Sequence, residues 1–170
     1  MTETSTTTQV YRVYIKTTAR AIFDAITQSE WTERYGYTGL VDYDLQPGKP
    51  YVVRPSEPFK AAGEASGYDI PDVVVDGEVV EVDPPHKLVV TFRMLMDADM
   101  AAEGFTRLTY EIKETQEGVC SLTLTHELDG APRLAALVRG DGEDQGAGGG
   151  HAWVLSELKT LLETGTAFEG

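Results

Sequence analysis

Residues 88–96, Leu-Val-Val-Thr-Phe-Arg-Met-Leu-Met, carry the pattern that decides the fold. Every second side chain belongs to one apolar row, which comprises Leu88, Val90, Phe92, Met94 and Met96. Thr91 and Arg93 have the opposite parity. Because side chains two apart in a strand point the same way, the pattern predicts a strand with one face in a core and the other in water.

The same alternation recurs on both sides of this stretch. It is present in Leu108, Tyr110 and Ile112, and again in Cys120, Leu122, Leu124, His126 and Leu128. The expected strands are 10–16, 40–45, 51–54, the adjoining segments 73–75 and 77–82, then 88–96, 105–113 and 119–128. Short turns at 47–48, 83–86 and 114–118 make neighbouring strands antiparallel, so we expect a curved antiparallel sheet of about six to seven strands.

Helical spacing indicates where helices flank this sheet. Thr18 is an expected N-cap, and a short amphipathic helix follows it, while Ser29 is placed to cap a second one. The longest expected helix is 151–163, whose broad apolar face comprises Val154, Leu155, Leu158, Leu161 and Leu162. The sequence therefore predicts an α+β fold in which the sheet wraps around a long C-terminal helix.

The remaining segments are expected to be irregular. Residues 55–71 mix Gly, Ser, Ala and charges without periodicity, so we interpret them as a long, mobile connection, and 131–139 as a short turn of helix. Residues 140–150 include six glycines and are expected to form a flexible surface loop. We expect a disordered tail at 1–9 and a single domain over 10–165.

Composition excludes several classes of function. The chain has 28 acidic and 14 basic residues, and its net charge of −14 repels nucleic-acid phosphates and anionic lipids. A solvated surface is the preferred interpretation of this charge, and attraction of a basic partner is the alternative. The lone Cys120 cannot form an internal disulfide, and residues 1–8 lack the features of a signal peptide, so we expect a cytoplasmic protein. No apolar stretch is long enough for membrane insertion.

Several segments together resemble the helix-grip fold of the START-like (SRPBCC) superfamily, in particular the branch related to the C-terminal domain of the activator of the heat-shock-protein-90 ATPase. The matching residues are 21–27 (Ala-Ile-Phe-Asp-Ala-Ile-Thr), 29–35 (Ser-Glu-Trp-Thr-Glu-Arg-Tyr), 77–85 with Leu88, 122–126, 150–153 (Gly-His-Ala-Trp), Leu158 and 161–162. These are structural landmarks and include no catalytic signature. The resemblance implies a cavity between sheet and last helix, which holds hydrophobic molecules in some relatives and serves protein contacts in others.

Candidate ligand-binding residues follow from the inward rows and from the aromatic residues near them. They are Trp31, Tyr35, Tyr51, Arg54, Phe92, Met94, Met96, Tyr110, His126 and Trp153. Such residues either fill a core or line a pocket, in which Met adapts to irregular ligands and Tyr hydroxyls fix their orientation. Arg54 is a candidate partner for a ligand carboxylate, and His126 is either a satisfied core histidine or a proton donor or acceptor to a ligand.

No residue pattern demands a metal, a cofactor or a nucleophile. His86, His126 and His151 lack ligand spacing, and Cys120 has no second cysteine or basic neighbour. Three functions remain open: a noncatalytic protein that binds a small hydrophobic or aromatic molecule, a co-chaperone-like or regulatory protein-interaction module, and a polyketide cyclase-like or dehydratase-like enzyme. We expect a monomer or homodimer.

Overall fold

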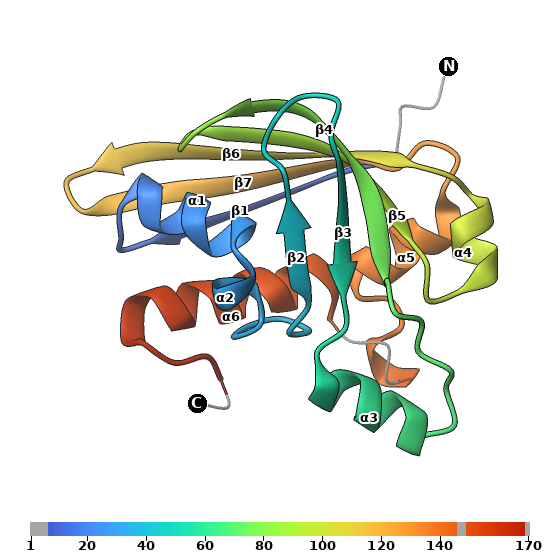
Figure 1. The fold of residues 1–170 in the computed structure, drawn as a ribbon. Helices are drawn as coiled ribbons and strands as arrows, with labels where there is room; N and C mark the ends of the chain where they lie inside the picture. Colours follow the sequence, from blue (N-terminus) through green and yellow to red (C-terminus); the bar gives the residue numbers. More distant parts are fainter. Residues whose placement is uncertain (1–6, 146–148, 169–170) are drawn as a thin grey trace.

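The computed structural model describes residues 7–145 and 149–168 and shows an antiparallel sheet packed against a C-terminal helix (Figure 1). The strands are β1 (Thr8–Ile15), β2 (Leu40–Tyr43), β3 (Pro50–Arg54), β4 (Val75–Asp83), β5 (Lys87–Met94), β6 (Thr106–Gln116) and β7 (Val119–Glu127). Their order across the sheet is β1-β7-β6-β5-β4-β3-β2, so the first strand pairs with the last. The α+β helix-grip fold expected from the sequence is confirmed.

Helices lie on one side and at both ends of this sheet (Figure 1). They are α1 (Ala19–Thr27), α2 (Ser29–Thr32), α3 (Glu57–Ala65), α4 (Ala98–Ala102), α5 (Pro132–Arg139) and α6 (Gly150–Thr164). Thr18 caps α1, because its hydroxyl accepts a hydrogen bond from the Ala21 amide at 3.1 Å. None of the helices in the described ranges is long and apolar enough to cross a bilayer.

The long helix α6 is held to the sheet through its apolar face and through the edge of β1. Leu155, Leu158 and Leu161 are buried in the main core, the cluster of buried side chains between the sheet, α1 and α6. At the edge, the Lys159 ammonium donates to the carbonyl oxygen of Tyr14 at 2.8 Å. These contacts fix which residues of α6 face the sheet and which face away from it.

A second, smaller cluster closes one end of the sheet. It comprises Leu128, Ala131, Leu134, Ala135 and Val138, and Phe92 and Met94 pack against both clusters. The end of β5 therefore lies where the main core meets the helices α4 and α5.

Four segments differ from the sequence-based expectation. Segments 73–75 and 77–82 are one strand, β4, with a register shift between Val79 and Glu81. The connection 55–71 contains α3, which was missed because none of its residues is buried, although Ser56 caps it. The short helix α4 was also missed, and the strand expected to reach Met96 ends at Met94.

The structure partly corrects the expected tail at 1–9 and the expected glycine-rich loop at 140–150. Strand β1 begins at Thr8, inside the expected tail, and residues 1–6 lie outside the described residues. In the expected loop 140–150, Gly140 is the left-handed C-cap of α5, residues Glu143–Gln145 form a 3-10 turn and Gly150 begins α6. Residues 146–148 of that loop lie outside the described residues.

Candidate functional site

Four tyrosines from different elements gather on the inner side of the sheet. Tyr51 on β3 donates its hydroxyl hydrogen to the carbonyl oxygen of Thr91 at 2.7 Å, and its ring stacks on that of Tyr43 with 4.7 Å between centroids. Tyr35, which follows α2, donates to the carbonyl oxygen of Ala25 at 2.9 Å. Burial raises the pKa of these three hydroxyls, and Tyr110 on β6 is close enough to raise it further through electrostatic interaction.

Two of these hydroxyl groups have no hydrogen-bond partner among the residues that the structure describes. No hydrogen bond joins the hydroxyl of Tyr43 or Tyr110 to any other described residue, and both side chains keep part of their surface accessible. Burial nevertheless raises the pKa of Tyr110 to about 12, and burial together with the neighbouring tyrosines raises the pKa of Tyr43 well above 10. Both groups are therefore protonated hydrogen-bond donors at neutral pH that remain available to a further molecule.

His126 on β7 lies in a hydrogen-bonded chain at the junction of the two clusters. Its Nε2 atom is 2.8 Å from the hydroxyl oxygen of Thr106, and its Nδ1 atom is 3.0 Å from Nε2 of His151. The His126 side chain is fully buried, and burial followed by the proximity of His151 lowers its pKa to about 3. Burial also lowers the pKa of His151 to about 4. Both imidazoles are therefore neutral at physiological pH.

Other expected site residues lie near these two groups. The ring of Phe92 meets that of His126 edge-on, with centroids 5.4 Å apart. Met94 is half-buried between the clusters, and Trp31 packs against the main core with the guanidinium of Arg34 lying 4.8 Å from its ring centroid. The structure thus brings Tyr35, Tyr51, Phe92, Met94, Tyr110 and His126 to the inner side of the sheet.

Three expected site residues do not join them. Arg54 is exposed at the end of β3 and pairs with Asp42 at 3.5 Å. Met96 lies beyond the end of β5 and is 41 % exposed. Trp153 lies on a side of α6 away from the sheet, where it is 38 % exposed and its ring meets Phe168 edge-on. None of the three therefore lies on the inner face of the sheet, although Trp153 lines a pocket beside α6.

Two residues of the inner groups were missed by sequence reasoning. Tyr43 shares its strand parity with the buried Val41, so alternation in the segment 40–45 was a usable signal. His151 precedes Leu155 by four positions and therefore lies on the apolar face of α6. Neither signal shows which residue each side chain meets, because the partners are distant in sequence.

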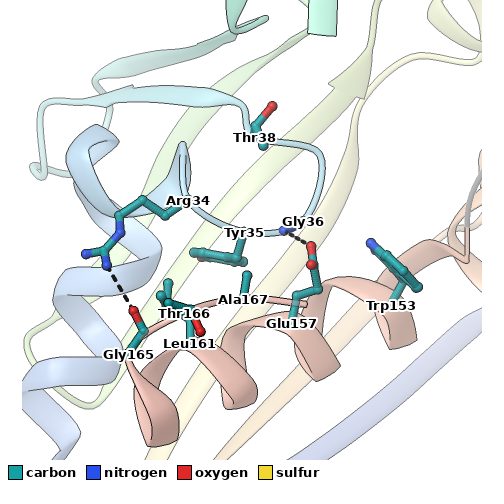
Figure 2. Close-up of a pocket in the computed structure, with 10 residues that line it drawn as sticks. All are labelled: Arg34, Tyr35, Gly36, Thr38, Trp153, Glu157, Leu161, Gly165, Thr166 and Ala167. Carbon is teal, nitrogen blue, oxygen red and sulfur yellow. Dashed lines mark hydrogen bonds between the residues drawn. The ribbon is translucent and has the colours of Figure 1, made fainter. Parts of the chain in front are cut away.

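A pocket of about 450 Å³ lies beside α6, between this helix, the segment after α2 and the chain after α6 (Figure 2). It is lined by Arg34, Tyr35, Gly36, Thr38, Trp153, Glu157, Leu161, Gly165, Thr166 and Ala167. Glu157 is buried there, and its carboxylate accepts hydrogen bonds from the amides of Gly36 at 2.8 Å and Phe168 at 3.2 Å. Among the described residues, no three His, Cys, Asp or Glu side chains form a group that could hold a metal ion.

Solved structures of known proteins share this architecture. An HSP90 activator from Plasmodium falciparum is 21 % identical, with a TM-score of 0.53 over 72 % of this chain and 73 % of that one. A protein from Mycobacterium smegmatis is 14 % identical, with a TM-score of 0.63 over 94 % and 92 % of the two chains. The Aha1 dimer from Colwellia psychrerythraea is 16 % identical, with a TM-score of 0.58 over 93 % and 97 %. At these identities the likeness concerns the fold.

The sequence itself supports a closer assignment. No curated protein matches it. Residues 16–163, however, match the model of the family described as activator of Hsp90 ATPase homolog 1-like protein, which covers most of the chain. The chain belongs to the activator of Hsp90 ATPase homolog 1-like family.

Proposed function

We propose that this chain is a noncatalytic cytoplasmic protein that binds a small hydrophobic or aromatic molecule between the inner face of the sheet and α6, without a cofactor. The observation that carries the proposal is the pair of unpartnered hydroxyls on Tyr43 and Tyr110, which remain partly accessible on an otherwise apolar inner face. Polar groups that face an apolar space without a partner are costly unless another molecule satisfies them.

Apolar side chains elsewhere on the inner face also suit an apolar ligand. Phe92 and Met94 supply adaptable apolar surface, while the two phenols would fix the orientation of a ligand oxygen. Burying some 300 to 400 Å² of ligand surface contributes about 8 to 10 kcal/mol before the cost of association is subtracted. We therefore expect about micromolar affinity, helped by one or two of these hydrogen bonds.

His126 is better suited to supporting this site than to chemistry. Both of its ring nitrogens are already in hydrogen bonds, and its pKa of about 3 keeps it neutral. A cyclase-like or dehydratase-like reaction that exchanges protons with His126 would first have to break the chain through Thr106 and His151. The hydrogen bonds at both ring nitrogens of His126 therefore favour ligand binding over catalysis by this residue.

Titration with Nile red, a neutral dye whose fluorescence rises in apolar surroundings, tests the proposal without interference from the net charge of −14. Met94→Trp should abolish dye binding by filling the proposed binding space from the end of β5, where Met94 packs against the main core, while leaving the unfolding midpoint nearly unchanged. Met96→Trp is the matched control, because Met96 is exposed outside the core and its replacement should leave binding intact. Native mass spectrometry of freshly purified protein should reveal a retained small molecule.

Failure of this proposal has a distinct signature. In a solid core, Met94→Trp would overpack the structure and destabilise it by about 1 to 3 kcal/mol. That result, together with no dye binding by the unaltered protein, would contradict the ligand-binding proposal and favour a protein-interaction function instead.

A regulatory protein-interaction module is the second candidate, and one surface favours it. Val10 and Tyr14 point outward from β1, the edge strand of the sheet, and both are more than half exposed. Exposed apolar side chains on an edge strand are typical of surfaces that pair with another chain. Replacement of both residues by Ser should then weaken self-association or partner binding in sedimentation experiments, without affecting the binding of Nile red.

A further inference from the structure

The pocket beside α6 contains a buried carboxylate, Glu157, that has no counterion among the described residues. Glu157 is 6 % exposed, and its two carboxylate oxygens accept the backbone amides of Gly36 and Phe168. No Lys, Arg or His side chain in the described ranges forms an ion pair with it. Buried carboxylates in proteins are normally paired with a cation. The Glu157 carboxylate could therefore pair with a cation supplied by a ligand.

Several aromatic residues lie near the Glu157 carboxylate. Trp153 lies one turn before Glu157 on α6, and the ring of Phe168 meets it edge-on with centroids 5.1 Å apart. Tyr35 lines the pocket as well. Tyr37 is close enough for Glu157 to contribute to raising its pKa, after the larger effect of burial. A carboxylate among aromatic faces is the combination that attracts organic cations, through charge and through the ring quadrupoles.

Arg34, the basic residue among those that line the pocket, contacts other groups than Glu157. The Arg34 guanidinium donates to the carbonyl oxygen of Gly165 at 3.3 Å and stacks over the ring of Trp31. Figure 2 shows Arg34 at one end of the pocket and Trp153 at the other, with Tyr35 between Arg34 and Glu157. Arg34 therefore leaves the charge of Glu157 open to a ligand and disfavours a ligand that carries positive charge at both ends.

We propose that this pocket binds an organic ammonium ion with an aromatic or aliphatic body. The ammonium group would lie at the Glu157 carboxylate, and the body would extend along Tyr35 and Leu161. The volume of about 450 Å³ is within the range of small-molecule sites. The net charge of −14 attracts such cations to the protein surface. This pocket shares Tyr35 with the group of inner tyrosines, but its lining does not include Tyr43 or Tyr110, and the proposal does not depend on the function proposed above.

Isothermal titration with 2-phenylethylammonium chloride, compared with 2-phenylethanol, tests the site. The alcohol has the same body without the charge. We expect the ammonium to bind at least about tenfold more tightly than the alcohol, and its affinity to fall as salt increases. Glu157→Gln should remove most of this preference. Trp153→Ala should weaken ammonium binding while keeping both hydrogen bonds of Glu157.

Two controls separate this site from the inner face of the sheet. Tyr110→Phe and Met94→Trp should leave ammonium affinity unchanged. Three results would each overturn the proposal: equal affinity for the ammonium and the alcohol, no binding at about 10 mM ammonium, or unchanged ammonium affinity in Trp153→Ala. If Glu157→Gln does not fold, the comparison of the two probes and the Trp153→Ala variant still decides the question.

Discussion

The Nδ1 atom of His126 lies 3.0 Å from the Nε2 atom of His151, and this contact joins β7 to the first turn of α6. The direction of the hydrogen bonds follows from their far end. The Thr106 hydroxyl donates to the carbonyl oxygen of Phe92, so its oxygen must accept from Nε2 of His126. His126 Nδ1 then accepts from Nε2 of His151, which requires His126 to be neutral with its proton on Nε2. The pKa of His151, lowered by burial to about 4, keeps that ring neutral as well.

This pair predicts that the protein loses stability in mild acid. In the unfolded chain a histidine has a pKa near 6.5, whereas in the folded chain the pKa values are about 3 and 4. Below pH 6.5 the unfolded state therefore binds protons at these histidines while the folded state does not. The free energy of unfolding consequently falls as the pH falls toward 4. Each histidine should cost about 1 to 2 kcal/mol by pH 5, measured as the free energy of unfolding in urea at pH 7, 6 and 5.

Substitution of single histidines separates this effect from the titration of carboxylates. His151→Gln should reduce the slope of stability against pH between 7 and 5, while His86→Gln should keep it, because His86 is exposed on a turn. A slope that is the same in both variants would show that the buried pair does not titrate in this window.

Much of the fold could be predicted because strand parity reports burial locally. Leu88, Val90 and Leu108 were assigned to the core by alternation alone, and all three are buried. The rule weakens in the middle of the sheet. By the same parity Thr123 on β7 belongs to the wet face, yet it is buried, because β7 lies between β1 and β6 and the Arg12 side chain on β1 donates to its hydroxyl at 2.9 Å.

The site was harder to predict, because its contacts join residues that are far apart in the sequence. His126 and His151 show no metal-binding or catalytic spacing, and only the packing of α6 on β7 brings them together. Glu157 lies among apolar positions of α6, where a charged residue is normally expected to face solvent. Its burial depends on the segment after α2 and on Phe168, whose positions no local pattern specifies.

The placement of α6 on the sheet predicts a large effect at Leu158. This side chain is buried in the main core, so Leu158→Ala should reduce the free energy of unfolding by about 2 to 5 kcal/mol. Ser156→Ala, on the exposed side of the same helix, should change it by less than about 0.5 kcal/mol. Chemical denaturation that finds similar small losses in both variants would contradict the observed packing of the helix.

Two tyrosines of the inner group should respond differently to loss of their hydroxyl. Tyr51→Phe removes the hydrogen bond to the Thr91 carbonyl and should cost about 0.5 to 1.5 kcal/mol of stability. Tyr110→Phe removes no hydrogen bond to a described residue, so its stability should be nearly unchanged while the affinity for a ligand on the inner face falls. A stability loss in Tyr110→Phe as large as that in Tyr51→Phe would show that its hydroxyl supports the fold.

The junction of α5 and α6 predicts a strong requirement for glycine at position 150. Gly150 has φ +71°, and a Cβ atom there would lie 2.1 Å from the carbonyl oxygen of Val138. Gly118, in the turn between β6 and β7, has a similar φ of +79° but open space around it. Gly118→Ala should therefore cost only the backbone penalty of about 1 to 2 kcal/mol, whereas Gly150→Ala adds a steric penalty of about 1 to 3 kcal/mol. Thermal unfolding of the two variants side by side measures that difference, and equal losses would mean that the two helices do not approach each other this closely in solution.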